Sequence, residues 1–139
     1  MKKLLLSVTT MFVALTINAQ VSREQSSTTV DLYKGSNSIS FTQFARSSDT
    51  TYALYFQNRE YQHIVSLEYI SMRSKKDAID FLTIVLEAFE TEESLTVTVG
   101  NQSIYMSKGL GGMYIAKGGA YFILTRRQAE EILKTITNG

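Results

Sequence analysis

Few residues of this chain carry side chains suited to catalysis, and the acidic ones are the most clustered. Glu87, Glu90, Glu92 and Glu93 follow one another closely. Paired carboxylates can act as acid and base in glycoside hydrolysis, or bind calcium, but the alternating aspartates of a calcium loop are absent. The four glutamates fall at the predicted end of a helix, where negative charge opposes the helix dipole. This mismatch indicates either a contact with a partner or a solvated turn.

Histidine, cysteine and serine give less support for a catalytic site. His63 is the only histidine and there is no cysteine, so the chain lacks the ligands of a His/Cys metal cluster. A lone histidine in a predicted strand is usually a packing or surface residue, and no serine lies in a G-x-S-x-G context. We therefore assign no catalytic residue, no metal ligand and no cofactor. The enzymatic alternative is a small hydrolase that uses carboxylates of residues 87–93 with His63 or a tyrosine.

Tyrosine is the polar aromatic residue in which the chain is enriched, with eight copies. In the strand registers given below, Tyr105, Tyr114 and Tyr121 share the sheet face opposite the aliphatic one, and we expect Lys117 beside them. Tyrosine rings pack on apolar surfaces while their hydroxyls form hydrogen bonds, a combination that suits sugar or peptide binding. These four residues are the candidate ligand-binding site. Two structural alternatives remain: cross-strand tyrosines stabilise any half-exposed sheet, and the first predicted helix would bury them if it covered this face.

Two predicted hairpins fix these registers, with turns at Gly100-Asn101 and at Gly118-Gly119. The cross-strand pairs that follow are Val99 with Gln102, Val97 with Ile104, Leu95 with Met106, Lys117 with Ala120, Ile115 with Phe122 and Met113 with Leu124. This register gathers the bulky apolar side chains on one face, whereas a shifted register would mix the faces. The glycine-rich stretch 108–112 between the hairpins lacks phosphate-loop spacing and is interpreted as turn and bulge positions. It is also a second candidate for contact with a partner.

Both halves of the chain predict the same succession of elements. Strands within 94–124 form a meander that ends in a helix over about 125–137. The first half predicts strands at 29–33, 38–44, 51–57 and 62–71, followed by a helix over about 74–90. Ser74 with Asp77, and Thr125 with Gln128, form capping boxes at the two helix starts. The starts SKKDAIDFL and TRRQAEEIL agree in kind at seven of nine positions, which indicates a duplicated strands-then-helix unit, although caps and amphipathic periodicity impose much of this likeness.

The first 19 residues predict where the protein acts. Lys2 and Lys3 precede an apolar stretch that ends at Ile17, and Ala19 supplies a small residue at a suitable cleavage position. This pattern is typical of a secretory signal peptide, and the stretch is too short and too interrupted for a membrane anchor. Residues 20–29 are rich in Ser, Thr and charge and predict a flexible lead-in. Residues 30–139 remain as a single α+β domain.

Charge and cysteine content narrow the function further. Two of the 14 Lys and Arg residues lie in the leader, which leaves 12 basic against 13 acidic residues in the exported protein. Nucleic-acid binders need a basic excess to neutralise phosphates, so we expect no nucleic-acid partner. Without cysteine the protein forms neither a disulfide nor a lipid anchor on a cysteine. We therefore expect a periplasmic or secreted bacterial protein with no membrane anchor after cleavage.

The sequence as a whole predicts an α+β fold: an antiparallel sheet of six to eight strands, bent or split in two and packed by two helices. The predicted function is a small, non-catalytic binding or interaction module. Its partner is a protein, a peptide or a glycan, and the sequence leaves that choice open. Besides the hydrolase, the remaining alternative is a self-associating structural protein, a homo-oligomer in which the tyrosine face meets a second copy of itself.

Overall fold

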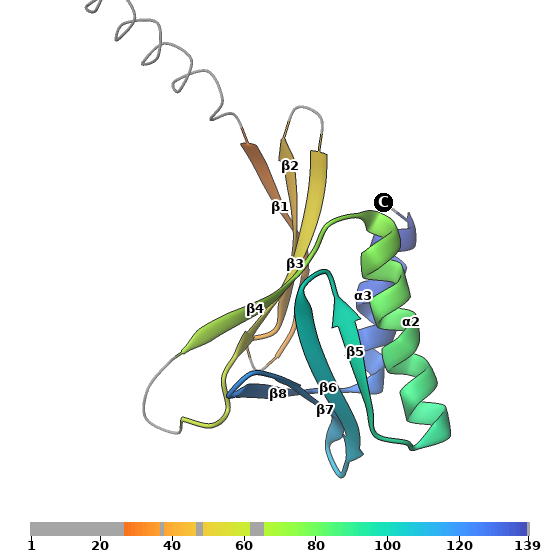
Figure 1. The fold of residues 1–139 in the computed structure, drawn as a ribbon. Coiled ribbons are helices and arrows are strands. Elements are labelled where there is room, and N and C mark those ends of the chain that lie inside the picture. The colour runs from red at the N-terminus through yellow and green to blue at the C-terminus, as the bar shows by residue number, and fades with distance from the viewer. Residues whose placement is uncertain (1–26, 37, 47–48, 62–65, 139) are drawn as a thin grey trace, which may run out of the picture.

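The computed structural model describes residues 27–36, 38–46, 49–61 and 66–138 (Figure 1). Within these residues the chain forms two four-stranded antiparallel sheets and two helices, an α+β fold. The elements are β1 (Ser27–Lys34), β2 (Ser40–Arg46), β3 (Asp49–Gln57), β4 (Leu67–Met72), α2 (Lys75–Thr91), β5 (Leu95–Val99), β6 (Gln102–Gly109), β7 (Gly112–Lys117), β8 (Ala120–Leu124) and α3 (Arg126–Asn138). The predicted α+β class with antiparallel strands and two helices is confirmed, and of the two open alternatives, a bent sheet or a split one, the split sheet is found. The predicted signal peptide and His63 lie outside the described residues.

The first sheet has the strand order β1-β2-β3-β4. Strand β1 begins at Ser27, so residues 27–29, which were expected to belong to the flexible lead-in, are part of a strand. Strand β4 begins at Leu67, and residues 62–65 of the strand predicted over 62–71 lie outside the described residues. The pairing of β1 with β2 shifts between Asp31 and Tyr33, which marks a bulge.

The second sheet has the order β5-β6-β7-β8 and the registers that its glycine turns predict. Val99 pairs with Gln102 in the first hairpin, and Lys117 pairs with Ala120 in the second. Gly100 and Gly118 have φ angles of 62° and 60°, the left-handed conformation that these turns require. The remaining predicted pairs are confirmed as well: Val97 with Ile104, Leu95 with Met106, Ile115 with Phe122 and Met113 with Leu124.

Both helices begin at the hydroxyl residues that the sequence indicates. The Asp77 amide donates to the Ser74 hydroxyl over 3.1 Å at the start of α2. At the start of α3 the Thr125 hydroxyl accepts from the Gln128 amide over 3.1 Å, and the Thr125 amide donates to the Gln128 side chain over 3.0 Å. These contacts satisfy backbone donors that a helix leaves free at its first turn.

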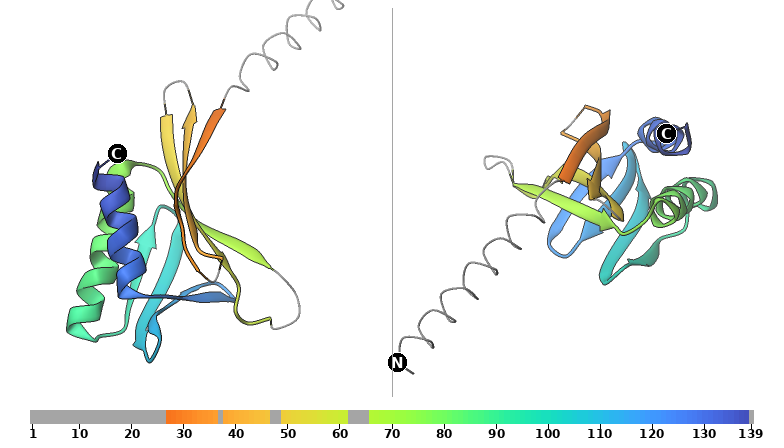
Figure 2. Two further views of the ribbon diagram at one scale, coloured as in Figure 1. Left: turned by 180° about the vertical axis from the view of Figure 1, so that it is seen from behind. Right: turned by 90° about the horizontal axis from the view of Figure 1, so that it is seen from above.

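The core lies between the two sheets and the pair of helices. The helices lie side by side on one side of the molecule (Figure 2). Phe56 of β3 and Phe122 of β8 stack across the core with ring centroids 4.2 Å apart. Ile104 and Met106 of β6 are fully buried on the same inner face of the second sheet, in one cluster with Phe81 of α2. On the outer face of the second sheet Tyr105 is exposed, whereas on the outer face of the first sheet Thr42 and Ala53 are also buried.

Candidate functional site

Three tyrosines of the second sheet meet on its outer face. Tyr105 of β6 and Tyr121 of β8 both pair with Ala116 of β7, so they occupy one row across the sheet. Tyr114 lies two residues before Ala116 on β7 and therefore points from the same face in the neighbouring row. The predicted gathering of these three residues on one face is thus confirmed. We call Tyr105, Tyr114 and Tyr121 the tyrosine ladder.

The rings of the tyrosine ladder contact one another in sequence. The centroids of Tyr105 and Tyr114 are 6.3 Å apart with an edge-to-face angle of 69°, and those of Tyr114 and Tyr121 are 5.0 Å apart at 31°. Tyr105 is 42% exposed, and the other two side chains are half-buried. Helix α2 packs against the inner face of this sheet, so the alternative in which the first helix buries the tyrosines is wrong.

The outward strand positions around the tyrosine ladder are uncharged. The Ser94 and Ser107 hydroxyls are 3.2 Å apart, and their hydrogen bonds to Tyr105 lower the pKa of its phenol. Among the described residues, the outward positions of β5 to β8 carry no charged side chain. Besides the three tyrosines and two glycines, they are Thr96, Thr98, Ser103, Ser107, Ala116 and Ile123.

The connection that follows β3 fixes the Tyr121 end of the ladder. Asn58 is 4% exposed, and its side-chain oxygen accepts from the amides of Tyr121 and Glu60, each over 3.1 Å. The Arg59 amide donates to the Tyr121 carbonyl over 3.0 Å, and the Tyr121 hydroxyl donates to the Arg59 carbonyl over 3.3 Å. The free edge of β8 is therefore closed at Tyr121, which holds the backbone of this tyrosine in place. Sequence reasoning missed Asn58 and Arg59 because no spacing or motif marks them.

A cleft continues from the tyrosine ladder past this edge. It has a volume of about 450 Å³, and its lining includes Gln57, Asn58, Arg59, Tyr61 and Tyr121. Amide, guanidinium and phenol groups therefore stand next to the aromatic surface. Such a mixture donates and accepts hydrogen bonds without imposing a strong field of one sign.

Lys117 does not belong to the tyrosine ladder, and the expectation that it lies on this face is wrong. It pairs with Ile104 and Ala120, both buried, so it projects from the inner face of the second sheet. Its ammonium donates to the Tyr69 carbonyl of β4 over 2.7 Å and lies 5.0 Å from the centre of the Tyr69 ring. The physical reason is the alternation of side chains along β7, which separates Lys117 from Tyr114 by an odd number of residues.

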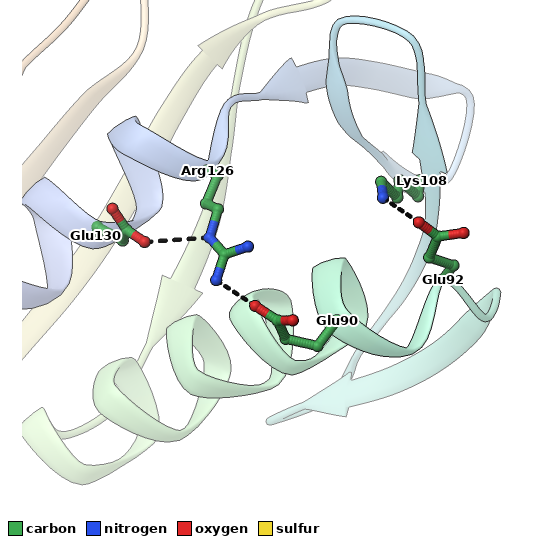
Figure 3. A network of polar contacts seen from close by, with 5 residues as sticks. All are labelled: Glu90, Glu92, Lys108, Arg126 and Glu130. Carbon is green, nitrogen blue, oxygen red and sulfur yellow. Dashed lines mark hydrogen bonds and ion pairs between the residues drawn. The ribbon is translucent and has the colours of Figure 1, made fainter.

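Two of the four acidic residues at the end of α2, Glu90 and Glu92, form ion pairs with basic partners (Figure 3). Glu90 forms an ion pair with Arg126 at the start of α3, and Arg126 also contacts Glu130 over 3.2 Å. Glu92 caps α2 with a φ of 59° and forms an ion pair with Lys108, which lowers the pKa of its carboxyl. These cations compensate the charge that opposes the helix dipole, and the sequence hides them because they lie 36 and 16 residues away.

Two further carboxylates border a groove between α2 and β5. Asp77 and Asp80 line this groove, which has a volume of about 220 Å³ and is otherwise flanked by residues such as Val97 and Phe81. Asp80 is held by Lys76 at 2.6 Å. No group of three or more acidic or histidine side chains that could hold a metal ion occurs within the described ranges.

The stretch 108–112 is a tight turn, as predicted. Gly109 pairs with Gly112, which leaves Leu110 and Gly111 as the two turn residues. Gly112 has a φ of 144°, and a Cβ atom there would lie 2.6 Å from the Leu124 carbonyl oxygen. Leu110 is fully exposed. The turn therefore offers one apolar side chain to solvent, and the glycines serve the backbone.

Comparisons with known proteins add no assignment. No family model matches the chain, and neither a curated protein nor a solved structure is significantly similar to it. In the part of the chain that the structure describes, none of the helices is long and apolar enough to cross a membrane. The functional argument therefore depends on the geometry of the chain itself.

Proposed function

We propose that this chain is an exported, non-catalytic binding module that holds a neutral glycan on the tyrosine ladder. The observation that carries the proposal is the ladder itself, three tyrosine rings in contact on a solvent-facing sheet that carries no charge around them. A pyranose ring has an apolar C–H face and a rim of hydroxyls. The first packs on aromatic rings, and the second exchanges hydrogen bonds with phenols, serines and threonines.

The adjoining cleft supports a glycan over a charged peptide. Gln57 carries an amide, and Arg59 carries a guanidinium, which are groups that bond sugar hydroxyls in several directions. A strongly acidic or basic peptide would find no opposite charge on the outer face of the second sheet to offset its desolvation. The desolvation cost is smaller for a neutral polymer than for a charged peptide when it leaves water for this surface.

The two alternatives have less support from the geometry. A hydrolase at the end of α2 would use carboxylates of residues 87–93, and two of these four, Glu90 and Glu92, are each committed to an ion pair on the surface, whereas Glu87 and Glu93 are exposed. Self-association through the tyrosine ladder uses the same surface as the glycan, so it is a competing outcome of one experiment. Light scattering on the wild type decides between them, because a monomer at high concentration removes the self-association alternative.

The binding test is affinity electrophoresis of the protein in gels that contain neutral polysaccharides. Suitable probes are hydroxyethyl cellulose, xyloglucan, galactomannan, dextran and soluble starch. We expect at least one polymer to retard the wild type, and Tyr105→Ala to raise the dissociation constant about 10-fold, since loss of one aromatic contact of about 1.4 kcal/mol corresponds to that factor. Tyr105→Phe separates the ring from its hydroxyl, and Leu110→Ala is the matched exposed control. Unretarded migration in every gel, or equal behaviour of Tyr105→Ala and Leu110→Ala, would contradict the proposal.

Export is a separate part of the proposal and has its own test. The basic start, the apolar stretch and Ala19 support cleavage before Gln20. When the full chain is expressed in a bacterium, we expect mass spectrometry of the periplasmic or medium fraction to find a protein that begins at Gln20. Recovery of an intact chain with Met1 from the cytoplasm would contradict export.

We also infer that the fold is a duplicated unit of four strands and a helix. Both halves have this order, with each sheet a simple meander. Ser74 and Thr125 begin the two helices in the same way, which supports the likeness of the two helix-start sequences. A duplicated unit would carry related surfaces on its two sheets.

A further inference from the structure

A second row of aromatic rings lies on the outer face of the first sheet. Phe44 of β2, Tyr55 of β3 and Tyr69 of β4 contact one another in sequence. The centroids of Phe44 and Tyr55 are 6.4 Å apart with an edge-to-face angle of 61°, and those of Tyr55 and Tyr69 are 5.7 Å apart at 46°. We call these three residues the second ladder.

The second ladder faces away from the core. Leu54 and Phe56, the neighbours of Tyr55 along β3, are fully buried on the inner face, so Tyr55 points from the outer face. Tyr69 pairs directly with Tyr55 and is 49% exposed. Phe44 and Tyr55 are half-buried. The tyrosine ladder has the same pattern of exposure, with one exposed ring and two half-buried rings.

The outward positions of this face carry hydroxyls as the tyrosine ladder does, among them Ser40, Thr51 and Ser71. They also carry the charged residues Asp31, Lys34 and Asp49, and Thr42 and Ala53 are buried. The carboxylate of Asp31 is occupied by Lys34 at 3.0 Å and by the Thr42 hydroxyl at 3.0 Å.

The two ladders occupy corresponding strands. Each takes one ring from the second, third and fourth strand of its sheet, and in each the first pair is edge-to-face and the second pair is closer. The registers differ, because Tyr55 and Tyr69 are direct partners whereas Tyr114 and Tyr121 lie in neighbouring rows. The correspondence is therefore one of face, strand and chemistry, and no register match is needed for two surfaces to bind the same ligand class.

We propose that the second ladder is a second glycan-binding face, and that one molecule of this protein joins two neutral polysaccharide chains. This inference rests on the proposed function of the tyrosine ladder. The stacked pair of Phe56 and Phe122 joins the inner faces of the two sheets through the core, and each ladder lies on the opposite face of its own sheet. Two polymer chains can therefore occupy the two ladders together. Lys117 over the Tyr69 ring holds this ring at the edge of the second ladder.

Two surfaces on one rigid body have a measurable consequence. Binding through both faces to a polymer matrix makes the second contact intramolecular, which raises the apparent affinity by about 100-fold or more without new contacts. A soluble polymer would be cross-linked by the protein, whereas a short oligosaccharide would only fill two independent sites. The number of binding sites per molecule therefore distinguishes a protein with two binding faces from a protein with one.

The experiment compares the wild type with Tyr105→Ala, Tyr69→Ala, the double variant and Leu110→Ala. The probes are the polysaccharide that retards the wild type most, in soluble and immobilised form, and its hexasaccharide. We expect the wild type to bind two hexasaccharides by calorimetry and to raise the light scattering of the soluble polymer. Each single variant should weaken one of the two hexasaccharide sites about 10-fold, reduce the scattering and bind the immobilised polymer about 10-fold more weakly, and the double variant should weaken both sites. Leu67→Lys, which places a charge at a position 64% exposed on the same face as Tyr69, replaces Tyr69→Ala if that variant does not fold.

The outcomes distinguish the two proposals. If one hexasaccharide binds and Tyr105→Ala weakens it about 10-fold while Tyr69→Ala matches Leu110→Ala, the second face is overturned and the proposed function stands. If no polysaccharide binds, or if Tyr105→Ala has no effect, the proposed function itself fails and the second face with it. Dimerisation of the wild type that is lost in Tyr69→Ala would assign the second ladder to a second copy of the chain, which also overturns the inference.

Discussion

Asn58 offers the sharpest test of how the tyrosine ladder is held. It is an uncharged buried residue on a connection between strands, and its side-chain oxygen accepts two backbone hydrogen bonds, from Glu60 and from Tyr121. One of these ties the loop to itself, and the other ties it to the edge strand of the second sheet. Asn58→Ala removes the acceptor and leaves both amides without this partner.

The magnitude follows from which amide loses access to water. Glu60 is exposed, so water replaces the lost bond at little cost, whereas Tyr121 lies in a half-buried strand. A buried donor left without a partner costs about 1–3 kcal/mol. We therefore expect Asn58→Ala to lower the free energy of unfolding by about 2 kcal/mol. With a urea m-value of about 2 kcal/mol/M for a domain of this size, the midpoint should fall by about 1 M.

The assay is urea unfolding followed by far-UV circular dichroism, with Asn101→Ala as the matched control. Asn101 is exposed in the turn between β5 and β6, and its φ is not positive, so alanine fits there and should change the free energy of unfolding by less than about 0.5 kcal/mol, or the midpoint by less than about 0.25 M. Equal midpoints for Asn58→Ala and Asn101→Ala would refute the reasoning. The Asn58 variant should also bind polysaccharide more weakly, because the Tyr121 end of the ladder is loosened.

Three further predictions concern the turn, the ion pairs and the phenol. Gly112→Ala should destabilise the fold by more than about 1 kcal/mol in urea unfolding, because φ is 144° and a Cβ would meet a backbone oxygen, whereas Gly111→Ala should have little effect. Arg126→Gln should lower the melting temperature in dilute buffer, and the loss should shrink in 1 M NaCl because exposed ion pairs are screened; an equal loss at both salt concentrations would contradict this. Ser107→Ala should raise the pKa of Tyr105 toward the ordinary value in a ¹³C-tyrosine NMR titration, since it removes a hydrogen bond that favours the phenolate; an unchanged midpoint would contradict the assigned contact.

The second sheet was the part of the fold most predictable from sequence. Two-residue turns at Gly100 and Gly118 leave one register for each hairpin, and the alternation of apolar residues agrees with it. The helix starts were predictable for a similar reason, because Ser74 and Thr125 make contacts within four residues of themselves. These turns and helix starts depend on contacts between residues close in sequence, so short sequence patterns were enough to predict them.

The first sheet and the second ladder depend on information that no short pattern holds. The turns that join β1, β2 and β3 contain no two-residue glycine signal, and β1 carries a bulge, so the sequence left the face of Phe44 undetermined. The pairing of Lys117 with Tyr69 spans 48 residues. Asn58 reaches Tyr121 over 63 residues. Each of these contacts exists only once two sheets are packed together.

The contacts that join the two sheets determine whether the two ladders keep a fixed position relative to each other. Gln102 of β6 uses its side-chain amide as a strand would use its backbone: it accepts from the Ser71 amide over 3.1 Å and donates to the Ser71 carbonyl over 2.7 Å. Lys117 bonds the Tyr69 carbonyl two residues earlier on the same edge. Strand β4 is thus bound to the second sheet by side chains, which occupy an edge that could otherwise pair with another chain. Because Tyr69 of the second ladder lies on this strand, its position relative to the second sheet is fixed by the same contacts, and a fixed geometry is what lets two weak faces bind a polymer network together.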